Sequence, residues 1–369
     1  MLLFTAFLIL LNICACSDPI FYTISREVPI ELPIISGSPV NFAKIGSKLY
    51  TASGKGLWEY NHGNGKWTWE KTNSPGGWIR SIAASGDYLY VVSENNGNVS
   101  LKRNYMAASV WESLIGSGDI QSVFSADDNI FYSVRNGDTY SIYHFNTPST
   151  PIAGLSAVSE LRGVVSDGTT PGSHYFICTR NGIYHALISA PNAATLVDGS
   201  NDKNFVGIIS LDNKIAAVTR DFNLHNVSVS GIGVAVANID GTRYKATGAL
   251  AEWSNTDGVK LLLVGREDTE TSTNTGHTFG YVEIQFDTGQ ANHPFEGFSY
   301  KNPGSGDADK TTVDSAETFA STIGVNSVNH IFQFDQNVLF ASTQTNGVWE
   351  CYRRNNGQRE WNTAQNRRE

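Results

Sequence analysis

The stretch KLYTASGKGLWEY, from Lys48 to Tyr60, decides the fold class together with KWTWE at Lys66 to Glu70. An aromatic and β-branched run ends in a glycine-containing turn, a second alternating run follows, and a run with tryptophan closes the unit, as consecutive antiparallel strands do. The pattern returns near the other end of the chain as NVLFASTQTNGVWECY, from Asn337 to Tyr352, followed by REWNT at Arg359 to Thr363. This recurrence predicts a chain built from copies of one β-sheet unit.

Seven copies of this unit can be placed along the chain. Aligned on the third residue of the second strand, they fall at Tyr50, Tyr90, Tyr132, Ile177, Ala217, Leu263 and Phe340. Subtraction of these positions gives first steps of 40, 42, 45, 40 and 46 residues, which is the length of a four-stranded propeller blade. Because one such sheet cannot bury both of its faces, blades stack around an axis and cover each other. The sequence therefore predicts an all-β fold, a single seven-bladed β-propeller of four-stranded antiparallel blades.

The step between the sixth and seventh copies is longer than the others. Two polar stretches, Glu267 to Gly276 and Pro303 to Asn326, absorb the excess. Within the second, Asp314 to Glu317 has the form of a capping box and predicts a short helix near residues 314–323. An eighth, degenerate blade is the competing interpretation of this region. Seven blades are favoured because two segments can supply the third and fourth strands of the sixth blade, namely Gly280 to Phe286 and Gly297 to Lys301.

The N-terminal segment from Leu2 to Ala15 is apolar and uncharged, too short to span a bilayer, and of the length of a signal-peptide core. It ends in Ile-Cys-Ala-Cys, which resembles the lipobox of bacterial lipoproteins and implies that Cys16 is lipidated and becomes the new N-terminus. No Lys or Arg precedes the apolar run, so an ordinary secretory leader cleaved near Ala15 is the alternative. The predicted domains are a signal peptide at 1–15, a lipid-anchored tether at 16–36 and the propeller at 37–369.

Short motifs in the third strands carry a resemblance to known propellers. They are GLWEY at Gly56 to Tyr60, NGIY at Asn181 to Tyr184 and NGVW at Asn346 to Trp349. These motifs resemble the blades of bacterial sensor ectodomains and of NHL/YVTN-type proteins. Leader and repeats together resemble bacterial propeller lipoproteins, with a spirochaete as one candidate source. The resemblance implies a protein of the cell envelope, lipid-anchored on the periplasmic side or at the cell surface, and its motifs carry no chemistry.

Two cysteines besides Cys16 remain after removal of the leader, Cys178 and Cys351. An even pair in an exported protein suggests a disulfide. The repeat places Cys178 in the second strand of blade four and Cys351 in the third strand of blade seven, on nearly opposite sides of a seven-membered ring. That separation exceeds what a disulfide tolerates, so the sequence predicts two buried thiols.

Composition excludes some partners. The chain of 369 residues has a formal net charge of -9 and no run of Lys or Arg, which argues against nucleic acid as a partner. The eight histidines show no metal-ligand spacing, and no nucleophile motif is present. We therefore expect no metal and no cofactor.

One set of charged residues follows the repeat. Arg135, Arg180, Arg220 and Arg266 end the second strands of blades three to six, and Arg80 and Arg162 begin the first strands of blades two and four. The turns between strands two and three share one face of a propeller with the links between blades. We therefore expect these arginines at one mouth of the central funnel, where they would bind a carboxylate, phosphate or sulfated sugar. In the alternative interpretation each pairs with an Asp or Glu of the next blade or bonds the carbonyl oxygens of a loop; the nearby acidic candidates are Asp138, Asp221 and Glu267.

Two functions remain open from the sequence. The leading hypothesis is a non-enzymatic binding protein, anchored to the membrane by its N-terminal lipid, that holds an anionic small molecule, a glycan or another envelope protein. The alternative is a hydrolase or lyase that acts on polysaccharide. An enzyme would need a carboxylate, His or Tyr facing the arginines within reach of one substrate.

Overall fold

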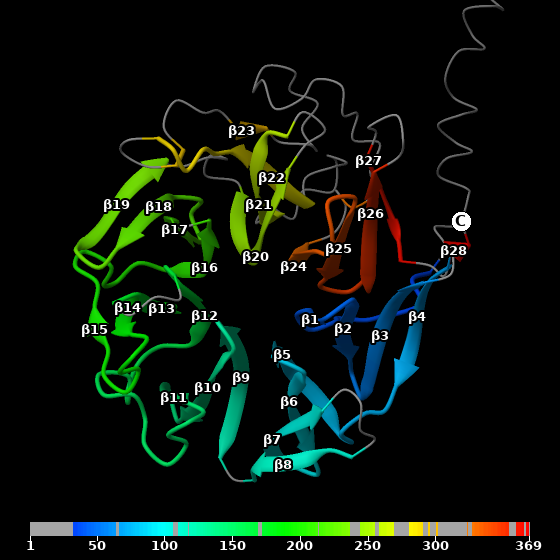
Figure 1. The fold of residues 1–369 in the computed structure, drawn as a ribbon, viewed down its shortest axis with the longest axis horizontal. Helices are drawn as coiled ribbons and strands as arrows, with labels where there is room; N and C mark the ends of the chain where they lie inside the picture. Colours follow the sequence, from blue (N-terminus) through cyan, green and yellow to red (C-terminus); the bar gives the residue numbers. More distant parts are fainter. Residues whose placement is uncertain are drawn as a thin grey trace, which may run out of the picture. The chain divides into compact units, whose positions relative to one another are not determined.

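The structure is a computed structural model that describes residues 32–63, 66–105, 110–116, 118–168, 172–212, 214–236, 244–254, 258–268, 280–290, 294–295, 300–301, 323, 327–353, 359–364 and 367–368. Within Pro33–Glu369 the strands form seven sheets around a common centre (Figure 1). The prediction of a seven-bladed all-β propeller is confirmed, and the eight-bladed interpretation is wrong. The leader with Cys16 and, apart from Ile323, the predicted helix at 314–323 lie outside the described residues. Over the described ranges, no helix is both long and apolar enough to cross a membrane.

Each blade is a meander that begins at the centre of the ring. The innermost strands of blades one to seven are β1 (Ala43–Ile45), β5 (Trp78–Ser85), β9 (Asp119–Ala126), β12 (Leu161–Ser166), β16 (Phe205–Leu211), β20 (Tyr244–Ser254) and β24 (Val328–Gln333). The second strands are β2 (Lys48–Ser53), β6 (Tyr88–Asn95), β10 (Asn129–Asn136), β13 (His174–Thr179), β17 (Lys214–Thr219), β21 (Lys260–Asp268) and β25 (Val338–Thr343). The third strands are β3 (Gly56–Gly63), β7 (Asn98–Tyr105), β11 (Thr139–His144), β14 (Gly182–Leu187), β18 (Leu224–Ser228), β22 (Gly280–Gln285) and β26 (Val348–Arg353). The fourth strands of blades one and two are β4 (Lys66–Thr72) and β8 (Glu112–Ile115), and those of blades four to seven are β15 (Thr195–Leu196), β19 (Gly231–Val236), β23 (Tyr300–Lys301) and β27 (Arg359–Thr363). A last strand, β28 (Arg367–Arg368), joins blade one.

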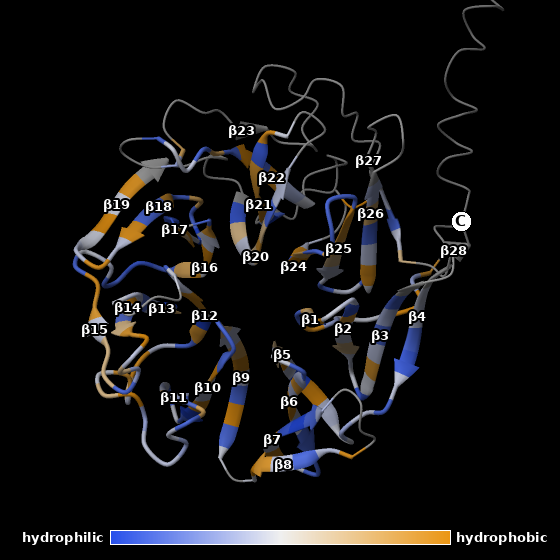
Figure 2. Cartoon of the chain, viewed as in Figure 1, coloured by the Kyte–Doolittle hydropathy of each residue, from blue (hydrophilic) through white to orange (hydrophobic). Residues whose placement is uncertain are grey.

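The hydrophobic core is divided among the gaps between blades. Seven clusters of buried residues can be defined in the described part of the chain, and each joins two neighbouring blades. Successive residues of a second strand serve opposite gaps, so that Leu49 packs toward blade seven and Tyr50 toward blade two. Apolar bands run along the strands all around the ring (Figure 2). Burial on both faces is the reason why the blades close into a ring.

Blade three departs from the regular pattern. It has three strands, and an irregular segment takes the place of the fourth. Tyr140 and Val158 exchange backbone hydrogen bonds of 2.8 and 2.9 Å, and Ile142 donates to the carbonyl oxygen of Leu155 at 2.9 Å. Gly154 has a φ of +87°, and a Cβ there would lie 2.7 Å from the carbonyl oxygen of Ala194. The segment is therefore bent toward blade four and cannot continue as a straight strand.

Both ends of the described chain meet at the seam between blades seven and one. Near the N-terminal end, Ile34–Gly37, which we call the strap, lies on blade seven. The amide of Val348 donates to the carbonyl oxygen of Ile35 at 3.0 Å, and that of Gly347 to the carbonyl oxygen of Gly37 at 2.8 Å. At the C-terminal end, β28 adds a fifth, antiparallel strand to the outer edge of blade one beside β4. Main-chain pairing at both ends thus holds the ring closed.

The two cysteines within the ring are buried thiols, as predicted. Cys178 lies in β13 of blade four and Cys351 in β26 of blade seven, and neither forms a disulfide. Burial raises the pKa of the Cys178 thiol well above its usual range. Both residues pack as small apolar side chains.

Candidate functional site

A pocket of about 340 Å³ opens where the inner strands of four blades begin. Its lining consists of Arg162, Arg180, Asn204, Val206, Arg220, Thr247, Gly248, Glu267 and Asn329. Arg162, Val206, Thr247 and Asn329 belong to β12, β16, β20 and β24, the innermost strands of blades four to seven. The pocket is therefore part of the central funnel, and we call it the funnel pocket.

Three of the six arginines singled out by the sequence line the funnel pocket. Arg180 directly follows β13 and donates from Nε to Oδ1 of Asn204 at 3.3 Å. Arg220 directly follows β17 and forms an ion pair with Glu267. Arg162 lies in β12 and pairs with Glu160 at 2.8 Å. The described lining contains three arginines and one carboxylate, that of Glu267, while Glu160 pairs with Arg162 from outside the lining. The described lining is therefore positive in a chain whose net charge is -9.

The other three arginines do not line this pocket. Arg80 joins blades two and three through ion pairs of 2.8 Å with Glu94 and with Asp119. Arg135 donates from Nε to the carbonyl oxygen of Gly137 at 2.9 Å, within its own turn. Arg266 is fully buried in β21. For these three residues the structure favours the alternative interpretation, in which the arginine stabilises the fold.

Strand length explains why equivalent positions differ. β13 and β17 end at Thr179 and Thr219, so Arg180 and Arg220 fall in the turns that face the funnel. β21 runs on to Asp268, and Arg266 consequently remains in the ladder, opposite Ala246 on one side and Gly280 on the other. A count of residues along the sequence cannot show where a strand stops.

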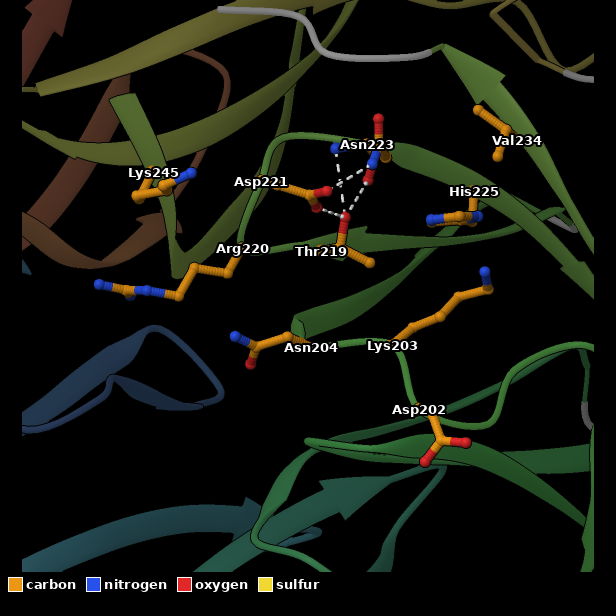
Figure 3. A pocket seen from close by; sticks show the side chains of 10 residues that line it. All are labelled: Asp202, Lys203, Asn204, Thr219, Arg220, Asp221, Asn223, His225, Val234 and Lys245. Atoms are coloured by element: carbon orange, nitrogen blue, oxygen red, sulfur yellow. Dashed lines mark hydrogen bonds between the residues drawn. The ribbon is translucent and has the colours of Figure 1, made fainter. Parts of the chain in front are cut away.

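A second pocket of about 570 Å³ lies next to the funnel pocket and shares Asn204 and Arg220 with it. It wraps around the turn between β17 and β18 (Figure 3), and we call it the turn pocket. Its lining consists of Asp202, Lys203, Asn204, Thr219, Arg220, Asp221, Asn223, His225, Val234 and Lys245. The sequence patterns point to none of His225, Lys203 and Lys245, because these residues come from different blades or links and follow no motif.

The turn itself is held by its own hydrogen bonds. The Thr219 hydroxyl donates to Asp221 at 2.5 Å, and the Asn223 side-chain amide donates to the same carboxylate at 2.9 Å (Figure 3). Between them, Phe222 has a φ of +62°, which is rare for a bulky residue, and its ring is buried between blades five and six. The packing of Phe222 therefore fixes the turn that both pockets border.

His225 is the most deeply buried polar group of the turn pocket, with 2% of its surface exposed. Within the described structure neither ring nitrogen has a hydrogen-bond partner. Burial, with Lys203 nearby, lowers the pKa of His225 to about 4, so the ring is neutral at pH 7. Among the described side chains, no group of three or more His, Cys, Asp or Glu residues could hold a metal ion.

Comparison with known proteins places the chain in a family. A sequence profile of the TP013X lipoprotein family matches residues 3–348. The chain belongs to the TP013X lipoprotein family. It is also 34% identical over 79 residues to an uncharacterized lipoprotein of Treponema pallidum (strain Nichols), a match that spans 21% of this chain and 20% of that protein. Membership of the TP013X family indicates a membrane-anchored protein of the cell envelope and confirms the resemblance to bacterial propeller lipoproteins.

Solved structures resemble this TP013X protein in fold alone. An ancestral GH74 enzyme aligns with 91% of this chain and 47% of its own at 12% identity, with a TM-score of 0.60. The extracellular domain of a putative hybrid two component system from B. thetaiotaomicron aligns with 87% of this chain and 38% of its own at 14% identity, with a TM-score of 0.54. YCF48 bound to D1 peptide aligns with 90% of this chain and 94% of its own at 10% identity, with a TM-score of 0.53. Identities this low carry no function from these proteins to the TP013X protein.

Proposed function

We propose that this chain is a lipid-anchored binding protein of the cell envelope that holds an anionic ligand in the funnel pocket without transforming it. The convergence of Arg162, Arg180 and Arg220, from two neighbouring blades, carries the proposal. Guanidinium groups form bidentate, charge-assisted hydrogen bonds to carboxylate, phosphate and sulfate groups. Arg180 bonds only a neutral amide among the described residues, so its charge is available to a ligand.

Glu267 is an internal counter-ion of the funnel pocket. Its ion pair with Arg220 neutralises one guanidinium while the pocket is empty. An anion that enters would compete with this carboxylate, and we expect moderate affinity that falls with ionic strength. Over the described lining Glu267 is the single carboxylate, whereas glycoside hydrolysis ordinarily uses a pair. This lining favours binding over a hydrolase that uses paired carboxylates.

Calorimetric titration with inorganic phosphate and with a sulfated disaccharide tests the funnel pocket. We expect saturable binding of at least one probe and at least a tenfold loss of affinity in the Arg162→Ala/Arg180→Ala double variant, which changes only residues of the funnel pocket. Arg135→Ala is the matched control, because it also removes an arginine at the end of a second strand but outside the pocket. Unchanged affinity in the double variant, or an equal loss in the control, would refute the proposal.

The lipid anchor is tested at Cys16. We propose that this thiol carries the lipid, with the residues before it removed as a signal peptide. Cells grown with an alkyne-bearing fatty acid should label the wild-type protein, and Cys16→Ser should lose the label and leave the membrane fraction. Cys14→Ser is the control, since it changes a cysteine two positions away. Labelling that survives Cys16→Ser, or that disappears in Cys14→Ser alone, would place the attachment elsewhere.

A further inference from the structure

The turn pocket contains charge and hydrogen-bonding capacity that no described residue of the protein uses. Lys203 and Lys245 both line it, and neither makes an ion pair within the described part of the chain. Lys203 lies beside His225, whereas Lys245 lies across the turn from it (Figure 3). The carboxylate of Asp221 is already occupied by Thr219 and Asn223. The other carboxylate of the lining, that of Asp202, accepts a hydrogen bond from Asn201 at 3.0 Å. Among the described residues, the charges of both lysines are therefore available to a ligand.

His225 occupies the same ladder position as Glu59 of blade one, whose side chain has hydrogen-bond partners within the protein. In the ladder between second and third strands it is paired with Ala217, as Glu59 is paired with Tyr50 in blade one. Glu59 accepts a hydrogen bond from the Tyr50 hydroxyl at 2.8 Å and forms an ion pair with Lys48 at 2.6 Å. The side chain of Ala217 has no polar atom, so the imidazole of His225 depends on another group in the pocket. A buried polar group without a partner is destabilising, and native structures seldom leave one unsatisfied.

The chemistry of the pocket selects a class of ligand. A neutral imidazole has one N–H donor and one acceptor nitrogen. A hydroxyl group can satisfy either nitrogen, whereas a carboxylate or phosphate can only accept, and an anionic group suits the ammonium of Lys203. We propose that the turn pocket binds a small hydroxylated anion, a uronic acid or a sugar phosphate, with its anionic group on Lys203 and a hydroxyl on His225.

This second site is separable from the funnel pocket. Lys203 and His225 line only the turn pocket, and Arg162 and Arg180 line only the funnel pocket. The two proposals can consequently fail independently. Arg220 lines both and is left unchanged in the test.

Titration with galacturonate and with glucose 6-phosphate, followed by calorimetry, tests the proposal and distinguishes the two anionic groups. We expect saturable binding of at least one of them and none of uncharged glucose. Lys203→Met and His225→Phe should each lower the affinity at least tenfold, and Lys203→Met keeps the test valid if His225→Phe does not fold. Lys214→Met, which removes the same charge elsewhere in blade five, should leave the affinity within twofold.

Three results would overturn the proposal. One is that neither anion binds to the wild-type protein. Another is that Lys203→Met binds as tightly as the wild type, or that Lys214→Met loses as much affinity. The third is that Arg180→Ala abolishes binding while Lys203→Met does not, which would place the anion in the funnel pocket instead.

Discussion

At the scale of single residues, the third strands carry a feature that the repeat motifs do not reveal. The residue opposite the aligned second-strand position is polar in every blade; the seven are Glu59, Arg103, Tyr143, Tyr184, His225, Glu283 and Glu350. In blade one the pair is Tyr50 and Glu59, which bond each other. In blade five the partner is Ala217, and the polar residue is left to face the turn pocket. Where the second strand offers an apolar side chain in place of Tyr50, the polar residue opposite must find its hydrogen-bond partner elsewhere.

The buried state of His225 has a measurable consequence for stability. Because burial lowers its pKa to about 4, the unfolded chain binds a proton at His225 between about pH 6.5 and about pH 4, whereas the folded chain does not. The free energy of unfolding therefore falls as the pH is lowered through this window, by up to about 1.4 kcal/mol per pH unit for one proton. Chemical denaturation between pH 7 and pH 4.5 would show the decline.

His225→Phe separates this contribution from those of other histidines. Burial also lowers the pKa of His144, of His185 and, to about 4, of His330, so the wild-type decline contains several protons. The variant keeps an aromatic ring against Phe205 and removes one titrating group. Its stability should depend less steeply on pH than that of the wild type. Parallel curves for the two proteins would contradict the assignment.

At the scale of elements, periodicity predicted the blades well. The seven aligned residues from Tyr50 to Phe340 all fall in second strands, because alternating apolar runs between glycine turns have few other ways to bury both faces. The missing fourth strand of blade three was not predicted. Its segment contains Pro148 and Pro151, and some of its main-chain partners, Asn192 and Ala194, come from far along the chain. Such partners leave no periodic signal.

The candidate site was only partly predictable for the same reason. The arginine pattern pointed to Arg162, Arg180 and Arg220, because the starts of first strands and the ends of second strands repeat with the blades. It could not separate them from Arg266, whose strand continues for two more residues. Nor could it find Lys203, which lies in the link between blades four and five. Links vary in length and conformation, and their side chains meet a neighbouring turn only in three dimensions.

At the scale of the whole molecule, ring closure depends on contacts between the two ends of the propeller. Ile35 is buried in the cluster between blades seven and one, together with Trp69 and Val348. The strap passes so close to Gly347 that a Cβ there would lie 2.0 Å from the carbonyl oxygen of Ile35. Gly347 also has a φ of +75°, where glycine is favoured. One glycine therefore permits the approach on which the seam depends.

Gly347→Ala should consequently loosen the seam, and the two buried thiols can report it. Cys351 lies in β26, the strand to which the strap is hydrogen-bonded, with its thiol packed toward blade six. Cys178 lies in β13 of blade four, across the ring. Gly86→Ala is a matched control because Gly86 has a φ of +53° but open space around its Cβ position. Gly86→Ala should lower the free energy of unfolding by about 1 kcal/mol through backbone strain alone, whereas displacement of the strap in Gly347→Ala should lower it by on the order of 2–4 kcal/mol.

Labelling with a thiol reagent under native conditions, followed by mass mapping, should show Cys351 reacting at least tenfold faster in Gly347→Ala than in Gly86→Ala, with a smaller change at Cys178. Equal acceleration at both thiols would mean that the ring unfolds as one unit and that the seam has no separate opening.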